Sequence, residues 1–302
     1  QNVSQGLGDA AFVVPLAVTG FFFLPLLFAL LLGRVYCAAA CPHGALQEAV
    51  VLKPVDVPPW LEHALGLLAY LYLGLAVLCA ATGSAYVICE YDPFIALFRM
   101  SGSANMLGLG ALFLLLGLFV GRPYCRFLCP FGALLRLASV LSRWRVKIYP
   151  DRCTDCHLCD ASCPYGAIRQ TTPPGEVEPR ARGLRRLAAL LVLLPVLVAG
   201  GAWLGRAIGA PFARMHASVR LADRLRLEEG VAAAKASEEV RAFQQTGRPV
   251  QAALDEAAEV VRRFNTGGAW FGAWAGLVVG LKLVSLARRR KRLEYEADRS
   301  AC

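Results

Sequence analysis

Four cysteines within residues 153–163 have the spacing that binds a cubane iron–sulfur cluster. They follow the pattern Cys-x-x-Cys-x-x-Cys-x-x-x-Cys-Pro, formed by Cys153, Cys156, Cys159, Cys163 and Pro164. A cubane cluster needs thiolates on a tight loop whose backbone N–H groups also turn toward the sulfurs, and this pattern is typical of such loops. Zinc also binds four thiolates, but its usual pattern is two separated cysteine pairs. We therefore expect a [4Fe-4S] cluster here.

The role of the fourth cysteine, Cys163, has two interpretations. In two-cluster ferredoxins the fourth cysteine of each run ligates the other cluster. The last residues, "EYEADRSAC" (294–302), loosely repeat "IYPDRC" (148–153), so we expect Cys302 to begin a second motif that is cut off at residue 302. Cys163 would then ligate a second cluster together with Cys302. The alternative is one self-contained cluster held by all four cysteines, so one or two clusters are expected.

A second cysteine pattern occurs twice. "GRVYCAAACPHGAL" (33–46) and "GRPYCRFLCPFGAL" (121–134) agree at nine of fourteen positions, and each follows an apolar stretch. Parallel repeats in a membrane are related by an axis along the membrane normal, so the two turns can face each other at one depth. The cysteines brought together in this way would be Cys37, Cys41, Cys125 and Cys129. Their repetition favours a further iron–sulfur centre or reactive thiols over simple packing of small apolar residues.

Charged and polar residues lie within and between these two repeats. Arg34 and Arg122 come three residues before the first cysteine of each repeat. They could offset the negative charge of a thiolate-ligated cluster or, equally, extend to lipid headgroups. His43 is replaced by phenylalanine in the second repeat, so we do not expect it to be a ligand. Asp92 precedes a proline, as a helix N-cap residue often does.

The composition indicates a membrane protein. Hydrophobic residues make up 57% of the 302 residues, charged residues only 18%, and the mean hydropathy is +0.49. The net charge of +10 does not indicate a nucleic-acid partner, because the basic residues gather at the ends of apolar segments, as in cytoplasmic loops. Five apolar runs are long enough to cross a hydrocarbon core of about 30 Å. They are residues 11–33, 63–81, 105–121, 185–208 and 268–287.

The basic residues also predict the orientation of the spans. Twelve arginines and lysines lie between residues 122 and 186, and "RRRKR" occupies 288–292, so both segments should face the cytoplasm. Counting back through the spans places 82–104 and 209–267 outside. The sequence thus predicts an all-α polytopic membrane protein with about five transmembrane helices and a small cytoplasmic ferredoxin-like 4Fe-4S insertion. It would lie in the inner (plasma) membrane of a bacterium, in contact with lipid, with its iron–sulfur motifs on the cytoplasmic side.

Four segments are predicted along the chain. They are a membrane domain with three spans and both repeats (1–143), a cytoplasmic ferredoxin-type 4Fe-4S segment (144–180), a two-span hairpin (181–292) with an outer helical cap (211–267), and the start of a second 4Fe-4S motif (293–302). The cap is polar and helical in period, with a break at "TGRP" (246–249).

The combination of motifs resembles the NosR/NapH-type membrane-bound 4Fe-4S proteins. It consists of two Cys-x-x-x-Cys-Pro turns after apolar spans, "CEYDPF" (89–94) between them, and a ferredoxin motif that follows. The resemblance covers about residues 10–170 well and 295–302 weakly. It implies electron transfer in anaerobic respiration, from quinol or a redox-protein donor to a periplasmic reductase, its maturation system or a flavin-domain partner.

No catalytic residues are expected, because no nucleophile with a base, phosphate-binding loop or paired carboxylates is evident. The chain therefore resembles an electron-transfer subunit more than a stand-alone enzyme. The alternative is an iron–sulfur accessory protein, for assembly or redox sensing, in which the cluster does not carry electrons in turnover.

Overall fold

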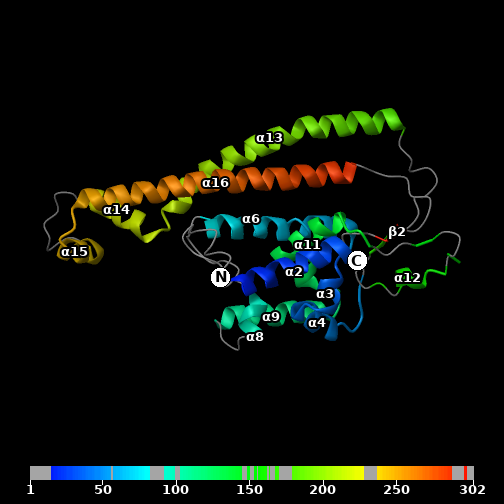
Figure 1. Cartoon of the computed structure of the whole chain (residues 1–302). Helices are drawn as coiled ribbons and strands as arrows, with labels where there is room; N and C mark the ends of the chain where they lie inside the picture. Colours follow the sequence, from blue (N-terminus) through cyan, green and yellow to red (C-terminus); the bar gives the residue numbers. More distant parts are fainter. Residues whose placement is uncertain are drawn as a thin grey trace. The chain divides into compact units, whose positions relative to one another are not determined.

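The chain is mostly helical and divides into two compact units (Figure 1). The units are residues Gln1–Leu187 with Leu286–Cys302, and Ala188–Ser285. The computed structural model describes residues 15–55, 57–81, 92–98, 103–144, 148–149, 153–154, 156–161, 163, 167–169, 179–227, 237–287 and 296–297. The expectation of a helical protein is confirmed. The helices are accompanied, in this part of the chain, by one ribbon of two short strands.

Each cysteine repeat folds into the same three helices. In the first repeat they are α2 (Leu16–Leu32), α3 (Val35–Ala39) and α4 (Pro42–Ala49); in the second they are α9 (Ala104–Gly117), α10 (Pro123–Phe127) and α11 (Pro130–Val140). The second cysteine of each repeat is the N-cap residue of the third helix, and a proline occupies the first helical position. Proline suits that position because its fixed φ matches the helix and its missing N–H would have no partner there.

The two repeats pack reciprocally. Helix α11 packs against α2, and α4 packs against α9 and α10, so the last helix of each repeat contacts the first helix of the other. A two-fold axis between the repeats would produce this pattern. Helix α6 (Leu68–Ala81), which follows α5 (Pro59–Leu65), packs against α11, and α8 (Pro93–Phe98) packs against α9.

One glycine in each repeat allows the third helix to approach the short helix before it. A Cβ atom on Gly132 would lie 3.2 Å from the carbonyl oxygen of Cys125, and a Cβ atom on Gly44 would overlap with the carbonyl oxygen of Cys37. The shared "PxG" element after the second cysteine therefore has a structural reason: the backbone of the cysteine turn leaves no room for a side chain.

Three helices are long enough and apolar enough to cross a membrane, among the residues that the structure describes. They are Pro59–Ala80, Ala181–Ala213 and Val250–Ala287, and they contain most or all of the predicted spans 63–81, 185–208 and 268–287. The predicted spans 11–33 and 105–121 correspond to the shorter apolar helices Thr19–Leu32 and Ala104–Gly117. At 1.5 Å per residue these helices do not reach about 30 Å. The count of five spans is therefore not confirmed.

The second unit is built on two long antiparallel helices, α13 (Arg180–Ala213) and α16 (Val250–Ala287). They meet along a row of glycines, in which Gly201, Gly205 and Gly209 of α13 face residues 264–276 of α16. A Cβ atom on Gly205 would overlap with the backbone of Gly268. Close approach of this kind is typical of packed transmembrane helices, because small residues let the two backbones touch.

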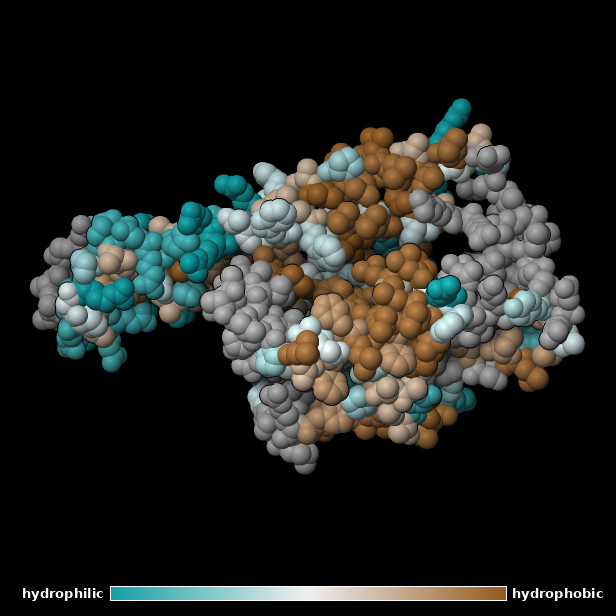
Figure 2. Space-filling view, in the orientation of Figure 1, coloured by the Kyte–Doolittle hydropathy of each residue, from teal (hydrophilic) through white to brown (hydrophobic). Residues whose placement is uncertain are grey.

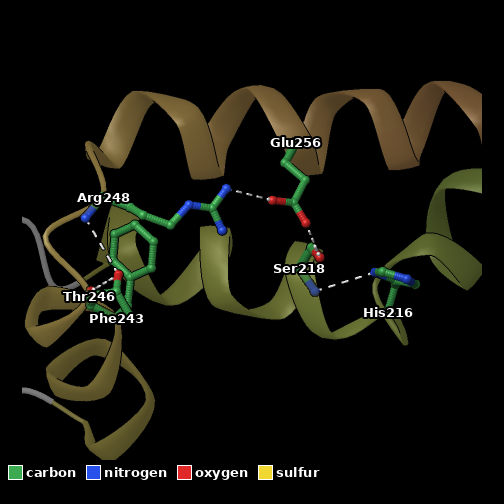
Figure 3. Close-up of polar contacts among 6 residues, drawn as sticks. All are labelled: His216, Ser218, Phe243, Thr246, Arg248 and Glu256. Carbon is green, nitrogen blue, oxygen red and sulfur yellow. Dashed lines mark hydrogen bonds and ion pairs between the residues drawn. The ribbon is translucent and has the colours of Figure 1, made fainter.

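The polar end of the second unit contains α14 (Ala217–Leu227), α15 (Glu238–Gln245) and the first turns of α16 (Figure 2). Leu225, Val240, Phe243 and Ala253 form a small hydrophobic cluster there. Arg248 and Ser218 both bind the carboxylate of Glu256, at 3.3 and 3.0 Å (Figure 3).

Helix α15 ends before the predicted break at 246–249, and α16 begins after it. Helix α16 runs unbroken across the predicted limit of the cap at residue 267, so the polar end and the apolar segment share one helix.

Candidate iron–sulfur sites

The four cysteines of the paired turns lie close to one another. Cys37 is in α3, Cys125 is in α10, and Cys41 and Cys129 cap the helices that follow. Burial and the neighbouring Cys41 and Cys37 thiols together raise the pKa of the Cys125 thiol to about 12. Burial and the neighbouring Cys125 and Cys37 thiols likewise raise the pKa of Cys129. The structure thus brings together the predicted set of four thiols from both repeats.

Hydrogen-bond donors point at these sulfurs in an equivalent way in the two repeats. The backbone N–H of Gly132 donates to Cys129 Sγ at 3.2 Å. At the matching position, burial raises the pKa of the Cys41 thiol, but hydrogen bonds from His43 and from the backbone of Gly44 lower it overall. Donors of this kind favour the thiolate over the thiol, which is the form that binds iron.

Arginine side chains also face the cysteines. Burial raises the pKa of the Cys37 thiol, while the charge and hydrogen bond of Arg34 oppose this rise. Arg122 is 9% exposed; its Nη1 donates to the carbonyl oxygen of Cys37 at 3.1 Å and its Nη2 binds the carboxylate of Glu48. These contacts favour the role of charge compensation for Arg122 over contact with lipid headgroups.

Gln47 connects the two repeats and was not singled out in the sequence. Its side chain is fully buried, and its Nε2 donates to the carbonyl oxygen of His43 at 2.9 Å and to Cys125 Sγ at 3.1 Å. Its Oε1 accepts a hydrogen bond from the backbone N–H of Tyr124 at 3.0 Å. The available signal was its alignment with Leu135 of the second repeat, since a polar residue at an otherwise apolar position needs a partner.

Asp92 is a second residue whose side chain binds two separate segments of the chain, at Phe94 and at Tyr124. Its Oδ1 accepts from the backbone N–H of Phe94 at 2.9 Å, which confirms the predicted N-cap. Its Oδ2 accepts from the Tyr124 hydroxyl at 2.7 Å, and burial raises the pKa of that hydroxyl, so it remains a donor. Because Tyr124 precedes Cys125, Asp92 lies beside a cysteine turn. The prediction that all of 82–104 lies at the opposite, outer end is therefore wrong for Asp92.

The cysteines of the ferredoxin motif occupy an accessible segment. Cys153, Cys156 and Cys159 are exposed and Cys163 is partly buried. The backbone N–H of Ala167 donates to Cys163 Sγ at 3.4 Å. A backbone donor to sulfur is a feature that the motif predicts for a cluster-binding loop.

A short ribbon follows this motif. Strand β1 (Ile168–Arg169) pairs antiparallel with β2 (Glu296–Ala297), with Ile168 opposite Ala297. The segment that leads to residue 302 therefore lies next to the segment that follows Cys163. Cys302 itself, and residues 82–91 with Cys89, lie outside the described residues.

The chemistry of both cysteine groups suits iron–sulfur clusters. Among the described residues, no group of three or more His, Cys, Asp or Glu side chains surrounds the position of a single ion. A cubane cluster distributes its thiolates over four iron atoms, so its ligands need not converge on one point. Thiols with N–H donors and nearby arginines fit such a cluster, because these groups stabilise its negative charge.

Comparison with known proteins points to the same chemistry. Residues 13–66 and 104–149 match a family described as a 4Fe-4S binding domain, and residues 146–169 match a second family with the same description. The first match contains both cysteine repeats, and the second contains the run from Cys153 to Cys163. No solved structure matches the chain.

Three relatives each align with nearly half of the chain. YccM of Escherichia coli, provisionally described as an electron transport protein, is 30% identical over 156 residues, covering 46% of this chain and 43% of YccM. Protein NirI of Paracoccus denitrificans is 34% identical over 158 residues, covering 48% of this chain and 23% of NirI. Regulatory protein NosR of Pseudomonas aeruginosa is 30% identical over 164 residues, covering 49% of this chain and 22% of NosR. The chain is thus similar to NirI and NosR, and residues 13–66, 104–149 and 146–169 are similar to 4Fe-4S binding domains.

These matches confirm the resemblance that the paired turns and the ferredoxin motif predict. It also confirms 4Fe-4S binding as the cofactor chemistry of these segments. The chain spans less than half the length of each of the three relatives. The number of clusters and the ligands of each remain predictions.

Proposed function

We propose that this NosR-like protein is a membrane-anchored electron carrier. Electrons enter from quinol or a reduced redox protein and leave toward a periplasmic reductase of anaerobic respiration, its maturation system or a flavin-domain partner. Five helices cross the membrane, and the iron–sulfur motifs face the cytoplasm. The proposal is supported by the 4Fe-4S family match and by the description of YccM.

One observation carries the proposal: thiols from two separate repeats lie near one another, and each has a hydrogen-bond donor. The Gln47 amide donates to Cys125, and the backbone N–H of Gly132 donates to Cys129. The backbone N–H of Gly44 donates to Cys41, and the Arg34 side chain donates to Cys37. Packing alone does not account for this arrangement, because a cysteine that only fills space needs no donors. An iron–sulfur centre accounts for the donors, because hydrogen bonds to its sulfurs help to set its reduction potential.

The residues of the paired turns have distinct roles in this proposal. Cys37, Cys41, Cys125 and Cys129 would hold the centre, which would supply one-electron transfer. Arg34 and Arg122 lie close enough to the thiols to offset negative charge, since both lower the pKa of Cys37. Glu48 holds Arg122 in place.

The second site is the ferredoxin motif, which we propose to share one ferredoxin unit with the chain around residue 302. The pairing of β1 with β2 supports this, because it joins the two segments directly. Cys153, Cys156 and Cys159 would hold one cluster, and Cys163 would reach a second cluster together with Cys302. Tethering of such a unit near the membrane would remove the diffusion step between donor and acceptor.

The test is a count of iron and acid-labile sulfide per chain in anaerobically purified protein. We expect Cys125→Ser to lower both, because it removes one thiolate of the proposed centre at the paired turns. Cys79→Ser is the matched control, since Cys79 lies in α6 outside both motifs. Unchanged iron in Cys125→Ser would contradict a centre at the turns.

Potentiometry followed by EPR separates the carrier from the accessory protein. A carrier should be reduced by quinol or by a low-potential donor and then reoxidised reversibly. Clusters that cannot be cycled would favour the assembly or sensing alternative.

A further inference from the structure

We propose that Gln47 sets the redox potential of the centre at the paired turns, through the hydrogen bond that its amide donates to Cys125. The inference rests on the proposed function, because it requires that Cys125 binds this centre. Gln47 would act as a positioning and potential-setting residue, without binding iron itself.

The orientation of the Gln47 amide is fixed by its partners. Nε2 lies between two acceptors, the carbonyl oxygen of His43 and the sulfur of Cys125, at 2.9 and 3.1 Å. Oε1 faces the backbone N–H of Tyr124 at 3.0 Å. A flipped amide would place oxygen against the carbonyl oxygen and N–H against N–H, so every bond would be lost. An N–H group is therefore held on the Cys125 sulfur.

The second repeat shows that this position does not need a polar residue for packing. Leu135 aligns with Gln47 and is buried to the same degree, at 1% against 0% exposure. A leucine thus fills the equivalent space in α11. Glutamine in α4 is favoured there only if its buried amide is fully hydrogen-bonded, which it is. The bond to Cys125 has no counterpart from the second repeat, so the centre would be asymmetric.

A hydrogen bond to a cluster sulfur stabilises the reduced state more than the oxidised state, because the reduced state carries more negative charge. The Gln47 amide should therefore raise the potential of the centre.

Two variants of Gln47 and one matched control test the inference by EPR-monitored potentiometry of the iron-loaded protein. Gln47→Leu copies the residue of the second repeat and removes the donor. Gln47→Glu keeps an acceptor for the Tyr124 N–H but replaces the donor with a carboxylate. Leu135→Met changes the equivalent buried position without changing any donor. Iron content and the thermal midpoint of the apoprotein are measured for all three.

We expect Gln47→Leu to keep its iron and to lower the ratio of reduced to oxidised centre at a fixed potential by roughly three- to tenfold. Tenfold corresponds to about 59 mV for a one-electron centre. Gln47→Glu should lower the ratio of reduced to oxidised centre further, and Leu135→Met should leave this ratio unchanged. The signal from the ferredoxin motif should not move in any variant.

Three results would overturn the inference. An unchanged potential in Gln47→Leu, in a protein whose centre depends on Cys125, would overturn it alone. Loss of the centre in both Gln47 variants but not in Leu135→Met would leave Gln47 with only a structural role. Unchanged iron in Cys125→Ser would overturn the proposed centre, and this inference with it.

Discussion

At the scale of single residues, a few polar side chains hold the cysteine turns together. Gln47 and Asp92 come from different parts of the chain, yet both bind Tyr124, one through its backbone and the other through its hydroxyl. The N-cap role of Asp92 is predictable, because it depends only on the proline that follows. The bonds to Tyr124 are not predictable in this way, because they join residues 32 and 77 positions apart.

The Asp92–Tyr124 bond gives a prediction for Tyr124→Phe. Loss of the hydroxyl leaves a buried carboxylate oxygen with one donor fewer, which destabilises a protein by about 1–3 kcal/mol. We expect a lower thermal midpoint in detergent solution. Tyr36→Phe is the matched control, because Tyr36 holds the equivalent position in the first repeat and is less buried. Equal midpoints for the two variants would contradict the importance of the Asp92 bond.

The two glycines of the turns give a second prediction at this scale. We expect Gly44→Ala to destabilise the protein more than Gly132→Ala. The added methyl group overlaps with the carbonyl oxygen of Cys37 in the first case, but lies 3.2 Å from that of Cys125 in the second. Thermal midpoints of the apoproteins provide the measurement. The reverse order would show that the two turns are packed differently from this description.

At the scale of helices, the sequence predicts which helices form better than it predicts where each helix begins and ends. The repeated motif anticipates that α2–α3–α4 and α9–α10–α11 fold alike, and Gly247 and Pro249 mark the break before α16. The two glycines of "NTGGAW" (265–270) do not interrupt α16, which continues through them. Its glycines face α13, and this tertiary contact overrides their low helix propensity.

The glycine contacts predict different effects for two neighbouring positions of α13. Gly205→Leu should separate α13 from α16, because its side chain would enter the backbone of Gly268. Gly200→Leu should have little effect, because nothing lies within 4 Å of a Cβ atom there. The distance between spin labels near residues 194 and 280 checks this, since it should increase only in Gly205→Leu. An unchanged distance would contradict the close packing.

At the scale of the whole molecule, the chain would have two separate iron–sulfur sites. One would belong to the paired turns and the other to the ferredoxin motif, and no cysteine is shared between the two motifs. The sequence predicts both groups of thiols, the ferredoxin motif from its local spacing and the paired turns from the internal repeat. It does not predict the donors to the paired turns, because these depend on how the two repeats pack against each other.

Two separate sites predict additive losses of iron. Cys153→Ser and Cys125→Ser should each lower the iron content, and the double variant should lose the sum of the two amounts, as expected for independent sites. Iron per chain and the EPR spectrum of the reduced protein measure this. A double variant that loses no more than one single variant would indicate one common centre.

Arg122 has a backbone conformation that a side chain rarely adopts, with φ of 52°. Such a left-handed conformation is unfavourable by about 1–2 kcal/mol for residues other than glycine. Glycine would relieve that strain, but it would leave Glu48 without its cation and the Cys37 carbonyl without its donor. The ion pair and the hydrogen bond of Arg122 therefore offset a backbone conformation that the residue alone would disfavour.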